Sequence, residues 1–115
     1  LSVRYTCFVI KEAISVKTET IQEMAAIQSG AIVSNVLTQN GSVTLFAMAQ
    51  GESISAHTSA CAAQAVVLTG TIIFTVDKEQ KELQPMECIH LTANLPHALY
   101  AEKDSRMLLI QKGEQ

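Results

Sequence analysis

Short apolar segments separated by turn residues fill the chain from residue 31 onward. Several alternate apolar and polar positions, and turn signals recur at intervals of roughly 8 to 12 residues, the spacing of an all-β sandwich or barrel. Strands do not alternate with long helical segments, so we expect no parallel α/β sheet. The predicted strands cover residues 31–37, 43–49, 54–57, 64–68, 71–76, 88–91, 97–100 and 106–111, with a charged turn at 77–81 before a short return strand at 82–83.

Two further features precede this β region. Residues 3–10 are rich in β-branched and aromatic side chains, and they predict an edge strand or an arm that packs on another surface. Residues 20–28 predict a short helix, because Thr20 and Glu23 have the spacing of a capping box, and Gly30 ends it. We therefore expect one domain, with the arm and helix in residues 1–30 and a β-barrel in residues 31–115.

Composition and charge narrow the classes of function. The formal net charge is -3 and Lys and Arg are not clustered, which argues against a nucleic-acid surface or an anionic membrane as partner. No apolar run approaches the roughly 20 residues of a membrane span, and the first residues lack the layout of a signal peptide. Cys7, Cys61 and Cys88 are too few and too far apart for a disulfide framework. These features predict a cytoplasmic protein with free thiols.

Two segments carry a recognisable pattern. The first runs from Gly51 through His57 to Gly70, and the second ends in Pro96-His97-Ala98. With the hairpin between them, they resemble the two motifs of small single-domain cupins over roughly residues 31–111. The resemblance implies an RmlC-like jelly roll, that is a double-stranded β-helix barrel with a short N-terminal helix before it. The family includes isomerases, dioxygenases and sugar binders, so function has to be argued from the site.

Cupins that bind a metal hold it with three His and one Glu. By the resemblance, His57 takes the first His position and His97 the last, whereas Ser59 and Ala63 stand where the second His and the Glu are usual. Ala63 offers no donor atom and a neutral Ser59 hydroxyl is a poor ligand, so two imidazoles remain. Zinc and non-haem iron sites normally have more protein ligands than two.

Two nearby side chains offer a replacement ligand. In one continuous strand, Cys61 would face the same side as His57, and its thiolate would suit Zn or Cu. Gln64 neighbours the position of the missing Glu, and a bulge would turn its amide inward. A divalent transition metal such as Zn, Fe, Mn, Ni or Cu is therefore a possible cofactor of this site.

Three functions follow from these residues. The first is binding of a small molecule in the barrel, with His57, Ser59, His97 and Tyr100 as polar groups of the pocket. The alternative is a metal-dependent enzyme of the isomerase or dioxygenase type that works with two histidines. A metal-free enzyme with His57 as base has less support, because no Asp lies in the motif segment. We expect a homodimer, in which the arm at residues 3–10 protects a sheet edge of the partner.

Overall fold

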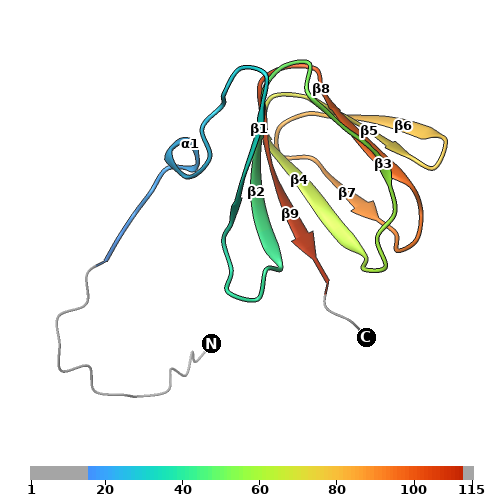
Figure 1. Ribbon diagram of the computed structural model, residues 1–115, viewed down its shortest axis with the longest axis horizontal. Helices are drawn as coiled ribbons and strands as arrows, with labels where there is room; N and C mark the ends of the chain where they lie inside the picture. Colours follow the sequence, from blue (N-terminus) through green and yellow to red (C-terminus); the bar gives the residue numbers. More distant parts are fainter. Residues whose placement is uncertain (1–15, 113–115) are drawn as a thin grey trace.

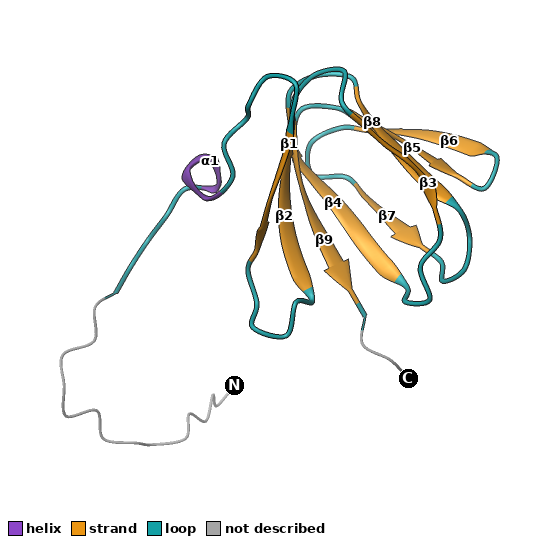
Figure 2. Ribbon diagram, in the orientation of Figure 1, coloured by secondary structure: helices purple, strands orange, loops and turns teal. Residues whose placement is uncertain are grey.

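Two antiparallel sheets packed face to face form the protein (Figure 1, Figure 2). The computed structural model describes residues 16–112. In this part of the chain, the five-stranded sheet has the order β1-β2-β9-β4-β7 and the four-stranded sheet the order β3-β8-β5-β6. The elements are α1 (Ile21–Met24), β1 (Ile32–Val36), β2 (Val43–Met48), β3 (Ser53–His57), β4 (Ala63–Thr69), β5 (Ile72–Val76), β6 (Glu79–Leu83), β7 (Cys88–Leu91), β8 (His97–Ala101) and β9 (Ser105–Gln111).

The sequence pattern predicted most of this architecture. Apart from the short return strand, the ends of each predicted strand agree with the structure to within one residue. The charged turn predicted at 77–81 is wrong, because β6 already begins at Glu79, which pairs with Val76. Asp77 and Lys78 alone form the turn, and Asp77 adopts the left-handed conformation that such a short hairpin connection needs (φ 56°). The charged residues after it are an exposed edge strand, which discourages pairing with another sheet.

The space between the sheets is filled by the inward-facing residues of both. Phe74, Met48 and Ile72 are completely buried there, and Met107 is almost so. Alternate residues of β4 point inward in the same way, and these are small: Ala63, Ala65 and Val67. A core built largely from aliphatic side chains suits a chain with only three Phe and no Trp.

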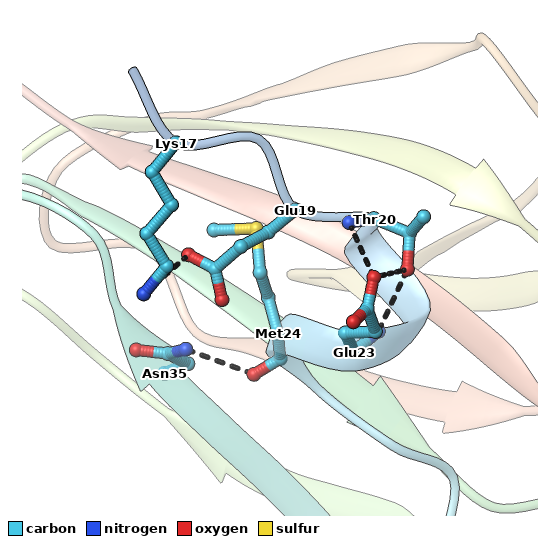
Figure 3. Close-up of polar contacts among 6 residues, drawn as sticks. All are labelled: Lys17, Glu19, Thr20, Glu23, Met24 and Asn35. Atoms are coloured by element: carbon cyan, nitrogen blue, oxygen red, sulfur yellow. Dashed lines mark hydrogen bonds and ion pairs between the residues drawn. The ribbon is translucent and has the colours of Figure 1, made fainter. Parts of the chain in front are cut away.

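The N-terminal segment covers part of the outer face of the five-stranded sheet. Ala25 packs there against Leu45 and Ala47, with all three side chains buried. The predicted capping box is confirmed, since Thr20 Oγ1 accepts a hydrogen bond from the Glu23 amide while the Glu23 carboxylate accepts one from the Thr20 amide (Figure 3).

This helix is shorter than predicted, with four residues instead of nine. The Met24 carbonyl accepts a hydrogen bond from Asn35 Nδ2 at 2.8 Å, and the Ala25 carbonyl accepts one from Arg106 Nε at 2.9 Å (Figure 3 shows the first). Side chains of the sheet thus satisfy carbonyls that a longer helix would pair internally. Contacts with the sheet therefore end the helix earlier than the helix propensity of residues 20–28 alone predicts.

The predicted arm at residues 3–10 lies outside the described residues, so the homodimer that it suggested stays a prediction. Between residues 16 and 112, no helix is both long enough and apolar enough to cross a membrane.

Candidate functional site

A β-bulge in β3 turns His57 toward the interior. Ile54 pairs with Leu99, but the next pair is His57 with His97, so β3 has one residue more than β8 over this interval. In a regular strand, the third residue after inward-facing Ile54 would point outward. The extra residue reverses that direction. His57 consequently lies on the same side of the sheet as the buried His97.

The two imidazoles form a close pair. Their ring centroids are 4.4 Å apart, with 65° between the ring planes. Nδ1 of His57 lies 3.0 Å from the Ser55 carbonyl oxygen, and Nδ1 of His97 lies 3.3 Å from that of Leu95. A carbonyl oxygen only accepts, so each Nδ1 carries the hydrogen and donates it. In the neutral rings, both Nε2 atoms are left as hydrogen-bond acceptors.

The two histidines differ in their exposure to solvent. His97 is 8% exposed, whereas His57 is exposed to solvent. Burial lowers the pKa of His97, because the charged ring loses hydration; a positive charge on His57 lowers it further, and the hydrogen bond to the Leu95 carbonyl acts in the opposite direction. At neutral pH His97 is therefore a neutral acceptor at Nε2.

Both rings line one cavity between the sheets, with a volume of about 100 Å³. The imidazoles are the only polar side chains among the described residues that line it. Because His57 is exposed, the cavity reaches solvent beside this ring. Its other walls are apolar side chains from both sheets: Phe46, Ile54, Phe74, Leu91, Leu99, Met107 and Leu109.

The predicted break between the strands at 54–57 and 64–68 is confirmed, so the continuous strand that would turn Cys61 toward the side of His57 does not form. β3 ends at His57 and β4 begins at Ala63, because the chain crosses from one sheet to the other in between. Ser59 is held in this crossing: its hydroxyl accepts a hydrogen bond from the Cys61 amide at 3.1 Å, and its carbonyl accepts one from the Asn94 amide at 2.7 Å. The structure thus uses Ser59 to shape a turn and does not place it along the cavity.

Neither of the two replacement ligands joins the histidines. Cys61 lies in the same crossing and is not part of the cavity wall. Gln64 alternates with buried Ala63 and Ala65, so it faces the outer side of the five-stranded sheet. There its Nε2 donates a hydrogen bond to Cys88 Sγ at 3.3 Å. No bulge turns this amide inward, because Gln64 keeps regular pairing with His90.

Tyr100 also lies away from the cavity. It is three residues after His97 in β8, and its side chain is 45% exposed on the opposite face of the sheet. His90 points outward, while Ile89 and Leu91 on either side of it pack in the core.

His90 lies beside two further hollows along the free edges of β6 and β7, each of about 350 Å³. These are lined by charged side chains in contact with solvent, for example Lys81, which pairs with Glu79 at 2.9 Å.

The donor atoms present do not fit the metal site that the resemblance implies. Among residues 16–112, no three His, Cys, Asp or Glu side chains come together as a group that would hold a metal ion. Two imidazoles are fewer protein ligands than structural or catalytic zinc sites and two-His-one-carboxylate iron sites have. We therefore derive no chemistry through a metal here.

The apolar wall is the part of the site that motif reasoning missed. Phe46 and Met48 are two positions apart in β2, so strand alternation places them on the same face of the sheet. Met48 is fully buried, but Phe46 is only partly so and lines the cavity. Strand alternation could have predicted part of this wall. The inward-facing residues of β2, β5 and β9 lie opposite one another between the sheets, and several of them line the cavity.

Comparisons with known proteins agree with this fold. A cupin domain model matches residues 44–111. A conserved protein of unknown function from Streptococcus pyogenes has a similar structure, with a TM-score of 0.81 and 27% identity over 90% of this chain and 92% of its own. A cupin superfamily protein from Desulfitobacterium hafniense is 26% identical over 76% of this chain and 82% of its own, with a TM-score of 0.71.

A conserved cupin barrel domain protein from Leptotrichia buccalis is 33% identical over 79% of this chain, with a TM-score of 0.73, although only 45% of that longer protein is covered. Comparison with the sequences of curated proteins gave no match. The two cupin motifs, the paired sheets and these similarities lead to one conclusion: the chain belongs to the cupin family.

Proposed function

We propose that this cupin binds a small, mainly apolar molecule in the cavity between its sheets and holds one polar group of that molecule at His57 and His97. The observation that carries the proposal is the composition of the wall: among the described residues, seven apolar side chains and only two polar ones, the paired imidazoles of His57 and His97. Small-molecule sites have this make-up, with few polar groups that fix the ligand's orientation.

The two acceptors define the ligand's polar group. A neutral Nε2 needs a donor, so a hydroxyl or N–H of the ligand suits it better than an ionised carboxylate. The size of the cavity limits the apolar part. An apolar cavity of about 150 Å³ holds benzene, and this one is about 100 Å³. A ring-sized ligand therefore inserts only partly and leaves its remainder beside exposed His57.

Binding of phenol, toluene and benzoate tests this chemistry, since the three share a ring and differ in the polar group. We expect phenol to bind more tightly than toluene by about 1 kcal/mol, one hydrogen bond, or roughly fivefold. His97→Leu keeps an apolar wall and removes one of the two acceptors, so it should lower the affinity for phenol toward that of toluene. Amide shift changes in heteronuclear NMR locate the bound ring. If none of the three perturbs Phe46, His57 or Met107, the proposal fails.

The metal-dependent alternative rests on one observation. Histidines that bind metals usually donate Nδ1–H to a carbonyl or carboxylate and bind through Nε2, and His57 and His97 both have this arrangement. The lack of a third protein ligand beside them in residues 16–112 argues against it. Elemental analysis of the untagged protein after loading with Fe, Mn, Ni, Zn or Cu separates the two functions. A stoichiometric metal that His97→Leu removes would favour the alternative over our proposal.

A further inference from the structure

The outer face of the four-stranded sheet carries a second hollow, with a volume of about 290 Å³. Ala98 and Tyr100 of β8 line it from the outer face. Leu99 between them also borders it, although its side chain, like that of His97, is buried between the sheets. Successive residues of a strand point to opposite faces. The sheet itself therefore separates this hollow from the cavity that holds the two histidines.

The strand register explains why the surface is recessed here. Tyr100 of β8 pairs with Ser53 of β3, and the next outward residue of β8, Ala98, pairs with Thr75 of β5. Thr75 in turn pairs with Gln80 of β6. Ala98 thus lies among neighbours with longer side chains, and its single methyl group leaves a depression between them.

The lining of the hollow combines uncharged polar side chains with apolar ones. The apolar residues are Ile54, Ile73, Ala98 and Leu99. Ser53, Ser55 and Thr75 contribute hydroxyl groups and Gln80 a carboxamide, all of which both donate and accept hydrogen bonds. Tyr100 adds an aromatic ring that is 45% exposed. No charged side chain is found among the described residues that line the hollow, in contrast to the carboxylates and Lys81 around the hollows at β6 and β7.

We propose that this hollow binds a neutral, polyhydroxylated ligand: one or two sugar rings of a glycan. The hydroxyl groups of a sugar donate and accept, as the four polar side chains do, and the apolar C–H face of the ring stacks on Tyr100. The absence of charge in the lining favours neutral sugars over phosphorylated, sulfated or acidic ones. The volume is close to the lower end of the range for small-ligand pockets, about 300 Å³.

A protein partner fits this face less well. Stable protein interfaces need a broad surface, and obligate ones are strongly apolar. Of the large apolar side chains that are exposed in residues 16–112, only Tyr100 lines this hollow. Val36 and Leu37 are at the far edge of the other sheet, so they cannot contribute to the same contact.

Titration of ¹⁵N-labelled protein with neutral oligosaccharides tests the proposal. The probes are maltotriose, cellotriose, xylotriose and diacetylchitobiose, with a sulfated heparin disaccharide as charged comparison. We expect at least one neutral probe to shift the amides of residues 53–55, 73–75 and 98–100 in a saturable way. Tyr100→Ala should weaken binding roughly tenfold, and Tyr100→Phe, which keeps the ring, by at most about threefold.

Two control variants make the outcome specific. Val36→Ala removes an exposed apolar side chain from the other sheet and should leave sugar binding unchanged. Leu109→Ala enlarges the inner cavity from the five-stranded sheet and should also leave sugar binding unchanged, which keeps this test separate from that of the proposed function. The proposal is overturned if no neutral sugar shifts these amides, if the shifts map to the cavity, or if the sulfated probe binds more tightly. Concentration-dependent broadening of the same amides without sugar would also overturn it and indicate a second copy.

Discussion

Replacing Gly70 by Ala should destabilise this fold more than the loss of glycine flexibility explains. Gly70 directly follows β4 and has φ +82°, a conformation that costs an L-residue about 1–2 kcal/mol. A Cβ at this position would also overlap the hydroxyl of Ser105 and the carbonyl oxygen of Asp104. The second effect has to be relieved by moving the start of β9.

The hydrogen bonds of Ser105 set the size of that second effect. Its side chain is completely buried, and its Oγ accepts from the Thr71 amide at 3.0 Å and lies 2.6 Å from the Lys103 carbonyl oxygen. Displacing Ser105 leaves the Thr71 N–H without a partner, which costs about 1–3 kcal/mol. The total for Gly70→Ala is about 2–5 kcal/mol, a large share of the 5–15 kcal/mol typical of folded domains.

Gly51 offers a matched control at the other end of the first motif. Its φ is +89°, but no heavy atom lies within 4 Å of a Cβ built on it. Gly51→Ala should therefore cost only the backbone term, about 1–2 kcal/mol. Urea denaturation of both variants, followed by circular dichroism, gives the two free energies of unfolding. Equal losses in the two variants would refute the argument that contact with Ser105 makes Gly70 necessary.

Three further predictions follow from the inner face and the termini. Folding lowers the pKa of His97, mainly by burial, so the unfolded chain takes up the proton first as the pH falls. The free energy of unfolding should therefore be highest above about pH 6.5 and decrease below it. In His97→Gln this decrease should be smaller, as measured by urea denaturation at pH 7.5 and 5.5. Phe74 is fully buried, and Phe74→Ala should cost about 3–5 kcal/mol by the same assay and enlarge the cavity. Light scattering should give the mass of a homodimer, and deletion of residues 1–10 should give a monomer; a monomeric full chain would contradict this.

The strands were predictable because a two-residue alternation of apolar and polar side chains marks each of them. A residue that faces the core of a sandwich is apolar and its neighbours face solvent, so alternation and turn residues locate strands without any knowledge of the partner strand. The helix was only partly predictable. The capping box of Thr20 and Glu23 indicates where it begins. Its end depends on hydrogen bonds from Asn35 and Arg106, which lie on strands distant in the sequence.

In the candidate site, the direction of a side chain could be predicted only in strands without a bulge. Tyr100 follows His97 by three positions in one uninterrupted strand, so alternation alone separates the two faces. His57 is the opposite case, because its direction depends on one extra residue opposite β8. A register shift belongs to a pair of strands, and a single sequence does not show which residue is left unpaired. The break around Ser59 was predicted, but a single sequence does not show that the chain changes from one sheet to the other there.

The glycines and the histidines of the motifs therefore carry different information. Gly51 and Gly70 have backbone conformations that the turns require, and Gly70 leaves no room for a side chain, so these residues serve the barrel whether or not it holds a metal. Ser59 and Ala63 stand at positions where the family's metal ligands are usual, and in this protein Ser59 shapes a turn and Ala63 fills the core. A match in spacing thus establishes the cupin fold. What this protein binds has to be decided by its two remaining imidazoles and by the chemistry of the faces around them.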